Sequence, residues 1–202
     1  MTIERIREPV SERRIRTSVM RILAETKLCS IATVAQGNRA HINTAFFAYS
    51  PNLELYFLSD PGSHHCRNLL ANSSMAMTVF NSNQGWERPG RGIQLFGTGH
   101  RIQGRRADRA EATYSSRFPA FARWLRGTTP GEKRQAARLR SYALFRFMPN
   151  RVKILDETEF GGAVFIIAGV RRHRTRDGEA RVELSWKGTE RLVPNEGSGS
   201  AR

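Results

Sequence analysis

The sequence predicts a mainly β fold with α-helices, in which antiparallel strands are joined by tight turns. Residues 28–35, 41–49 and 53–59 are short segments rich in apolar, β-branched and aromatic side chains. Turn sequences at residues 36–38 and 51–52 join them, which is typical of an antiparallel meander because parallel strands need a longer crossover. Further strand-like segments follow, so we expect a closed or partly closed β-barrel.

The remaining elements follow from the same patterns. After a polar start that ends at Pro9 and Val10, Ser11 has the position of a helix N-cap, and apolar residues recur on one face as far as Glu25. The other expected elements are a helix after Ser63, strands at 75–80, 92–102, 142–148 and 151–155, a helical segment at 105–125 broken by Pro119, a helix at 132–140, and a final hairpin of strands 163–170 and 181–186 around residues 176–178. The glycines inside 92–102 indicate a bulge, a bend or the close approach of a ligand.

The length of 202 residues favours a single domain, which we expect over residues 1–193. Within it we expect a helical insert at about 105–140 and a C-terminal hairpin at about 163–186. The end of the chain, 194–202, has the sequence PNEGSGSAR and is expected to be a disordered tail.

Several protein classes are disfavoured by composition. Apolar runs stay well short of the ~18 residues of a membrane helix, and the charged N-terminus lacks the apolar region of a secretory signal. Cys29 and Cys66 are far apart and form neither a CxxC pair nor a disulfide framework. We therefore expect a cytoplasmic protein with reduced thiols and no membrane partner.

The charge balance is strongly basic, with 33 Lys and Arg against 18 Asp and Glu and a formal net charge of +15. Such a charge suggests nucleic acid as a partner. The basic residues are nevertheless spread over many segments, and all but Lys27, Lys133, Lys153 and Lys187 are arginines. We therefore expect an acidic ligand rather than nucleic acid.

The segment 53–80 contains the strongest functional signal. Asp60, Pro61 and Gly62 end the strand at 53–59, and Ser63 then has the position of a helix N-cap. The residues that follow at once are His64, His65 and Arg67. Because a helix N-terminus has unpaired backbone N–H groups and a positive dipole end, this turn is a candidate phosphate site.

Three motifs make the resemblance to a known family specific. They are A-F-F-A-Y at the end of the second strand, then L-Y-F-L-S-D-P-G-S-H-H-x-R-N-L-x-x-N, then G-x-Q-L-F-G-T-G. The chain resembles the FMN-binding split barrels of the pyridoxamine 5′-phosphate oxidase-like superfamily, the flavin/deazaflavin oxidoreductases. The resemblance covers residues 26–102 and extends to 142–155. It implies an antiparallel split β-barrel with peripheral helices.

The resemblance also implies a cofactor and its site. Family members are typically homodimers with FMN in a groove shared by two subunits; some relatives use the deazaflavin F420, and others bind haem. In this chain the cofactor phosphate would lie against Ser59, Ser63, His64, His65 and Arg67. Pyridoxamine phosphate oxidases have a Ser-Arg-Lys triplet where this chain has a Ser-His-His triplet, and two further basic residues of theirs fall near Asn43 and Ala48. These departures argue against pyridoxamine phosphate oxidase activity itself.

The resemblance places the flavin ring against two strands. The residues implied in ring binding are Asn43, Thr44, Ala45 and Phe46 on one strand, Phe57 and Leu58 on the next, and Gln94 on the strand after the polar loop 81–91. Trp86, in that loop, would reach the flavin of the neighbouring subunit or cover the substrate. We expect no catalytic side chain, because the cofactor carries the redox chemistry.

Each of these residues also has a structural interpretation. His64 and His65 could be a solvated pair in a turn, and together with Cys66 they lack a second cluster that would complete a metal site, so no metal is expected. Gln94 could face solvent, and Phe46 and Phe57 could belong to the core.

Three functions remain as alternatives. The first is an FMN-dependent oxidoreductase that acts on an unidentified small molecule, as a homodimer with the flavin at the subunit interface. The second is an F420-dependent reductase on the same fold. The third is a protein without enzymatic activity that binds flavin, haem or nucleic acid. The sequence names neither the substrate nor the electron donor, and the substrate pocket is expected to be shaped by the helical insert and the final hairpin.

Overall fold

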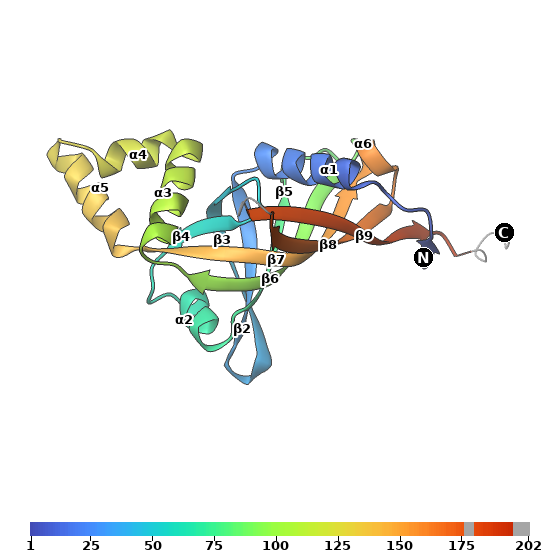
Figure 1. The fold of residues 1–202 in the computed structure, drawn as a ribbon, viewed down its shortest axis with the longest axis horizontal. Helices are drawn as coiled ribbons and strands as arrows, with labels where there is room; N and C mark the ends of the chain where they lie inside the picture. Colours follow the sequence, from blue (N-terminus) through green and yellow to red (C-terminus); the bar gives the residue numbers. More distant parts are fainter. Residues whose placement is uncertain (176–179, 196–202) are drawn as a thin grey trace, which may run out of the picture. The chain divides into compact units, whose positions relative to one another are not determined.

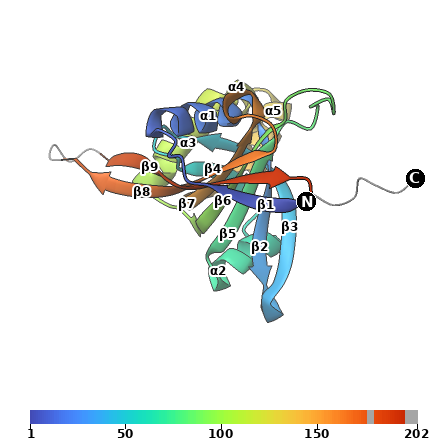
Figure 2. The same ribbon diagram turned by 90° about the vertical axis from the view of Figure 1, so that its right-hand side faces the viewer.

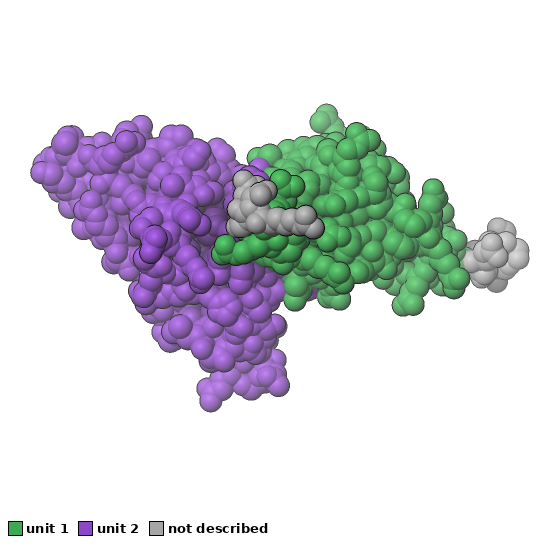
Figure 3. Space-filling view, in the orientation of Figure 1, with its two compact units in different colours: residues 1–26, 79–95, 150–202 green, residues 27–78, 96–149 purple. Residues whose placement is uncertain are grey.

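The computed structural model describes residues 1–175 and 180–195 and divides the chain into two compact units, coloured separately in Figure 3. Unit 1 comprises residues 1–26, 79–95 and 150–202, and unit 2 comprises residues 27–78 and 96–149. Each unit has its own set of buried apolar side chains.

The strands form an antiparallel sheet, which confirms the predicted mainly β, antiparallel fold class. They are β1 (Thr2–Ile6), β2 (Leu28–Ala35), β3 (Arg39–Tyr49), β4 (Leu55–Ser59), β5 (Ser74–Phe80), β6 (Arg91–Arg101), β7 (Ala143–Asp156), β8 (Val164–Arg174) and β9 (Ala180–Val193). Hydrogen-bonded neighbours follow the order β1-β9-β8-β7-β4-β3-β2-β5-β6, and β6 also pairs with β7.

The helices are numbered α1 to α6 in chain order and are labelled in Figure 1. They are α1 (Glu12–Glu25), α2 (His64–Ala71), α3 (Arg105–Arg117), α4 (Pro119–Leu125), α5 (Pro130–Ser141) and α6 (Glu157–Phe160), with a short 3₁₀ turn, η1 (Gln36–Asn38), between β2 and β3. The predicted break at Pro119 separates α3 from α4. Among the described residues, no helix combines the length and the apolar character that crossing a membrane requires.

Unit 2 is built around aromatic side chains of three neighbouring strands. Phe47 of β3, Phe57 of β4 and Phe145 of β7 are fully buried, and the rings of Phe57 and Phe145 stack with centroids 5.3 Å apart. The helix α2 packs on β2, where the Asn68 side chain donates to Thr33 Oγ1 at 3.0 Å. The core and this hydrogen bond fix the turn between β4 and α2.

The predicted interruption between residues 148 and 151 is wrong, because β7 continues through Pro149 and Asn150 as one strand. The reason lies on β6. A Cβ atom on Gly97 would stand 2.1 Å from the Met148 carbonyl oxygen and 2.7 Å from Pro149 Cα. A glycine on β6 therefore allows the backbone of β7 to pass close by, so Gly97 marks the approach of a strand rather than of a ligand.

Unit 1 contains a strand pairing that the sequence pattern does not indicate. The N-terminal residues, expected to be a polar segment, form β1, which pairs with β9 from Thr2 opposite Val193 to Ile6 opposite Thr189 (Figure 2). This pairing also explains why β9 runs on to Val193, beyond the predicted end at residue 186. The predicted turn 176–178 and most of the predicted tail 194–202 lie outside the described residues.

A buried carboxylate ties α1 to the end of β7 within unit 1. The side chain of Asp156 is fully buried; its Oδ2 accepts from Ser18 Oγ at 2.6 Å and from Arg21 Nη2 at 2.5 Å. Its Oδ1 accepts from the backbone N–H of Glu159 at 3.3 Å, which caps α6. The Asp156 carboxylate raises the pKa of the Arg21 guanidinium above its ordinary value.

We predict that Asp156→Ala lowers the free energy of unfolding by about 3 kcal/mol, because it leaves a buried serine hydroxyl and an arginine without their acceptor. Urea denaturation measures this change. Glu25→Ala is the matched control, since it breaks the more exposed pair of Glu25 Oε1 with Arg91 Nη1 at 2.7 Å and should cost less than about 1 kcal/mol. Equal losses in the two variants would contradict the assigned role of Asp156.

Candidate functional site

The turn between β4 and α2 is shaped by Asp60. The Asp60 carbonyl accepts from Ser63 N at 3.0 Å, and its carboxylate oxygen Oδ1 accepts from Gly62 N at 2.8 Å. Ser63 stands at the N-cap of α2 in an extended conformation, but its hydroxyl makes no capping hydrogen bond. The serine side chain is therefore directed to another group.

That group belongs to a small polar cluster of two hydroxyls and one imidazole. His65 Nε2 lies 2.8 Å from Ser59 Oγ and 3.3 Å from Ser63 Oγ, and the two hydroxyl oxygens are 3.5 Å apart. The cluster joins the last residue of β4 to the first turn of α2. The first N–H groups of a helix have no partner within the helix, so this cluster lies beside backbone donors as well.

Burial keeps the imidazole of this cluster neutral near pH 7. Desolvation lowers the pKa of His65 below its ordinary value, and the charges of His41 and His64 lower it further. The ring of His41 stacks on both neighbours, with centroids 5.9 Å from His64 and 6.4 Å from His65. A neutral imidazole offers one donor and one acceptor.

Arg67 lies along the outside of the same turn. Its Nη1 donates to the Gly62 carbonyl, and its Nη2 is 3.3 Å from His64 Nδ1. The arginine therefore brings a positive charge to the turn without contacting a carboxylate within the part of the chain that the structure describes.

A cavity of about 460 Å³ opens beside the cluster, entirely within unit 2. This volume is in the range of small-molecule sites. One side is formed by residues of β3, β4 and α2, namely Asn43, Thr44, Ala45, Phe46, Leu58, Ser59 and His65. The other side comes from the helical insert and its exit, namely Tyr114, Phe118, Ala120, Phe121, Trp124, Leu139 and Tyr142.

The structure thus brings together seven residues of the predicted site, those on the first side of the cavity. Phe57 lies behind the wall, fully buried, with its ring centroid 6.4 Å from that of His65. Ser63, His64 and Arg67 form the adjoining turn. The two remaining candidates belong to unit 1, where Trp86 is fully exposed and Gln94 is exposed on β6.

The aromatic wall from the insert was predicted only in outline, as a segment that shapes the substrate pocket. Its rings pack on one another: the Tyr114 centroid is 4.7 Å from that of Phe118 and 5.1 Å from that of Phe121. Phe118 also meets Phe46 of β3, edge to face, at 5.7 Å. The available signal was the recurrence of aromatic residues at 114, 118 and 121 on both sides of the break at Pro119, which brings the end of α3 and the start of α4 together through their rings.

Asn43 has an unused acceptor at the cavity wall. Its Oδ1 atom is buried and has no hydrogen-bond partner, whereas its Nδ2 donates to the Thr44 carbonyl at 3.4 Å. An orphaned buried acceptor is costly unless a ligand or water satisfies it. The cavity therefore suits a flat, largely apolar ligand that carries an N–H group on one edge and an anionic group at the Ser59 end.

The Cys29 thiol, next to Ala45 of the cavity wall, and the Tyr114 hydroxyl of the opposite wall both stay protonated near pH 7. Burial raises the pKa of the Cys29 thiol to about 12, and its Sγ contacts the Ala45 carbonyl oxygen at 3.3 Å. Burial likewise raises the pKa of Tyr114 to about 12. Within residues 1–175 and 180–195, no three His, Cys, Asp or Glu side chains are grouped so as to hold a metal ion.

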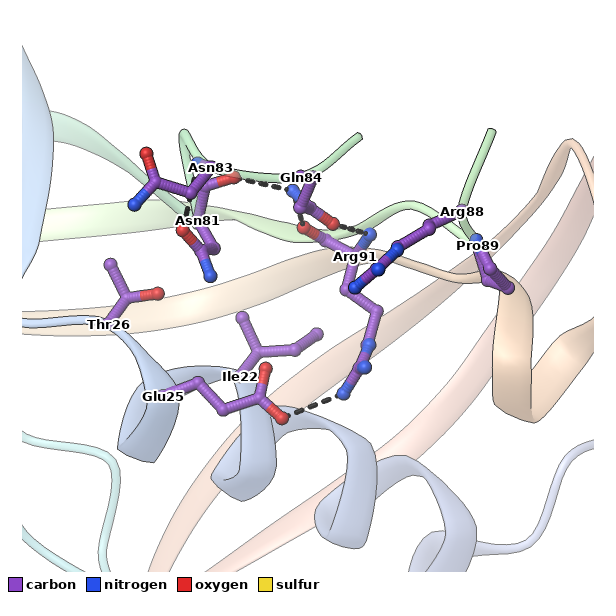
Figure 4. Close-up of a pocket in the computed structure, with 9 residues that line it drawn as sticks. All are labelled: Ile22, Glu25, Thr26, Asn81, Asn83, Gln84, Arg88, Pro89 and Arg91. Carbon is purple, nitrogen blue, oxygen red and sulfur yellow. Dashed lines mark hydrogen bonds and ion pairs between the residues drawn. The ribbon is translucent and has the colours of Figure 1, made fainter. Parts of the chain in front are cut away.

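A second cavity, of about 240 Å³, lies in unit 1 between the end of α1 and the loop before β6 (Figure 4). Gln84 closes this loop: its Nε2 donates to the carbonyls of Asn81 and Arg91, both at 2.9 Å, and its Oε1 accepts from Arg91 N at 2.5 Å. Arg91 in turn contacts Glu25 across the cavity (Figure 4). Since these polar groups bond to one another, we infer that they stabilise the loop rather than bind a ligand.

The sequence of the chain matches a known protein family. The family model described as pyridoxamine 5′-phosphate oxidase matches residues 15–156. No curated protein matches the chain in sequence. The match spans well over half of the chain and includes the turn between β4 and α2.

Solved structures agree with this fold. Atu2129 of Agrobacterium tumefaciens, a protein of unknown function, has 18% identity and a TM-score of 0.55, covering 70% of this chain and 55% of that one. A putative pyridoxamine 5′-phosphate oxidase from Listeria innocua has 16% identity and a TM-score of 0.51, covering 70% and 98%. A heme binding protein from Mycobacterium smegmatis has 11% identity and a TM-score of 0.55, covering 90% of each chain.

At such identities the structural likeness shows the fold alone, so the family rests on the sequence match over residues 15–156. With the antiparallel sheet and its peripheral helices, that match shows that the chain belongs to the pyridoxamine 5′-phosphate oxidase family.

Proposed function

We propose that the protein is an FMN-dependent oxidoreductase acting on a small molecule, and not a standard pyridoxamine phosphate oxidase. The observation that carries the proposal is the cavity of unit 2, which has a polar cluster at one end, aromatic walls, and the free acceptor of Asn43. A flavin mononucleotide has the matching parts: a phosphate, a planar ring system, and an N–H group on the pyrimidine edge of the ring.

The phosphate would be held at the turn between β4 and α2. Ser59 and Ser63 offer hydroxyl donors, His65 offers an imidazole N–H, and the start of α2 offers backbone donors. Arg67 supplies the nearby positive charge. The neutral state of His65 leaves this turn less cationic than the Ser-Arg-Lys triplet of the oxidases, and we expect weaker flavin binding for that reason.

The ring would lie between the β3–β4 wall and the aromatic wall of the insert. Asn43 would accept the ring N–H, while Phe46, Phe118 and Trp124 would exclude water. Bound FMN would supply hydride and electron transfer, which needs no acid or base from the chain. The residues of this chain would therefore bind, orient and desolvate the reacting groups.

The substrate would share the aromatic wall, which favours a small aromatic or otherwise planar molecule. We further propose that two copies of the chain form a homodimer with the flavin at their interface. Trp86 would then reach the flavin of the second copy, since its side chain is fully exposed on the loop that Gln84 closes. Gln94, which is exposed on β6, would be a second candidate for contact with the flavin of the second copy.

We predict that the protein binds FMN at least about tenfold more tightly than riboflavin, because only FMN carries the phosphate that the polar cluster can bind. His65→Ala should remove most of this preference, while riboflavin affinity stays near the wild-type value. Quenching of flavin fluorescence on titration measures both affinities.

His64→Ala should have a smaller effect than His65→Ala, since His65 lines the cavity and His64 contacts Arg67 on the outer side of the turn. Combining the two should weaken FMN binding further. His100→Ala, at an exposed histidine of β6, is the matched control. An unchanged ratio of FMN to riboflavin affinity in the double variant would contradict the phosphate assignment.

We also predict a pH dependence. The pKa of free His65 lies below its ordinary value, and a bound phosphate would raise it. The contribution of the imidazolium to binding is thus complete below the pKa of the free protein and lost as the pH rises through the pKa of the complex. The preference for FMN over riboflavin should increase as the pH falls from 8 to about 6.5, above the second phosphate pKa of about 6. His65→Gln should abolish this increase. If the preference of the wild-type protein for FMN over riboflavin does not change with pH, the predicted role of His65 protonation is wrong.

Absorption spectra of the purified protein with FMN, F420 or haem test the cofactor itself. Spectral changes on addition of FMN support the proposal, and a response to F420 alone would favour a deazaflavin reductase. Haem is the second candidate, because His65 is neutral and lines the cavity and because a heme binding protein has a similar fold. In that case a Soret band should appear with haem and be lost in His65→Ala.

A further inference from the structure

Unit 1 contains a separate cavity where β1 parts from β9. The pairing of these strands ends with Ile6 opposite Thr189, and the chain then turns away toward α1. The cavity has a volume of about 420 Å³. Its lining consists of Arg5, Ile6 and Arg7 at the end of β1, Ile167 of β8, and Trp186, Lys187, Gly188, Thr189 and Glu190 of β9. We name it the fork cavity.

A β-bulge opens this cavity. In the register between β8 and β9, Ile167 faces Gly188 and Ala168 faces Trp186, so Lys187 is an extra residue on β9. A Cβ atom on Gly188 would meet nothing within 4 Å, so the backbone there borders open space. Bulges redirect side chains and are frequent beside functional sites.

The fork cavity has cations without counter-charges. Arg5 lies opposite Glu190 in the register, but the Glu190 carboxylate binds Lys153 Nζ at 2.7 Å instead. Among the residues that the structure describes, Arg5, Arg7 and Lys187 are in no ion pair. Three exposed cations around one cavity repel each other and attract an anion.

The apolar part of the cavity is held in a fixed orientation. Trp186 Nε1 donates to the hydroxyl of the buried Thr189 at 3.0 Å, which positions the indole ring. Ile6 and Ile167 add aliphatic surface. An ordered indole beside three cations is suited to a flat apolar body that carries one anionic group.

We propose that the fork cavity binds a small aromatic anion, a carboxylate or a phosphate ester. Its ring packs against Trp186, and its anionic group lies among Arg5, Arg7 and Lys187. All lining residues belong to unit 1, whereas every residue of the proposed flavin cavity belongs to unit 2. The proposal therefore stands independently of flavin binding.

The full chain with Trp86→Phe and Trp124→Phe tests this proposal, because it leaves Trp186 as the single tryptophan of three. Its emission is followed during titration with benzoate, with phenyl phosphate, and with neutral benzyl alcohol. We expect saturable changes with one or both anions, and the tighter anion identifies the group preferred. Benzyl alcohol should bind at least about tenfold more weakly, and raising the salt concentration should weaken anion binding.

Charge-removing variants locate the anionic group. Lys187→Gln and Arg5→Gln should each weaken anion binding about three- to tenfold. Arg171→Gln is the matched control, since it removes an exposed cation of β8 that does not line the cavity. If a variant fails to fold, the Trp186 indole N–H signal in a ¹H–¹⁵N spectrum of the wild-type chain gives a second readout: it should move with the anions and stay in place with benzyl alcohol. Equal binding of anions and benzyl alcohol, an equal effect of Arg171→Gln, or no saturable response to either anion would overturn the proposal.

Discussion

The contact between Ser59 and His65 is the interaction on which the candidate site depends. At 2.8 Å it joins the last residue of β4 to the first turn of α2, and Asp60 shapes the short turn between them by accepting from both Gly62 N and Ser63 N. The hydroxyl of Ser63 points into the same cluster instead of capping its own helix. Since Asn68 fastens α2 to β2, the cluster faces the cavity in a fixed position.

The partly buried position of His65 disfavours the charged form of its imidazole, and this sets the charge of the candidate site. Burial and two neighbouring imidazoles lower the pKa of His65, so the imidazole at the candidate phosphate site stays neutral in the empty protein. A permanent Arg-Lys pair would bind phosphate more strongly but would need a counter-charge or solvent when the site is empty. A neutral histidine needs no such counter-charge in the empty site, and it gains a positive charge only when a bound anion or a lower pH favours protonation.

The parts of this fold that are local in sequence could be predicted, and the parts that depend on distant residues could not. The β2–β3 hairpin, α1 and the break at Pro119 follow from residues within one turn or one helical face. The pairing of β1 with β9 joins residues about 190 positions apart, and nothing in the polar N-terminal segment indicates its partner. Gly97 was recognised as unusual, but that it accommodates the backbone at Met148 becomes visible only when β6 and β7 are placed. The turn 59–67 is contiguous in sequence, so its residues alone predict it. The opposing wall of Phe118, Phe121 and Trp124 meets the turn only in the folded chain, so the sequence predicts no more than a helical insert that shapes the pocket.

The excess positive charge, scattered along the sequence, is unevenly divided in space. Unit 2 has fifteen Lys and Arg against five Asp and Glu, a net charge of +10, and unit 1 accounts for the remaining +5. Within unit 2, the segment 105–141, which contains α3, α4 and α5, carries ten of the cations and three of the acidic residues, yet the cavity wall that this segment forms contains no Lys, Arg, Asp or Glu side chain. If the proposed anionic ligand binds here, these cations would act on it at a distance, by raising its local concentration and its rate of association, more than by direct contact. Affinity and orientation would then come from the hydroxyls, the imidazole and the aromatic rings, because the lining of the cavity contains no Lys, Arg, Asp or Glu side chain in spite of the strongly basic chain around it.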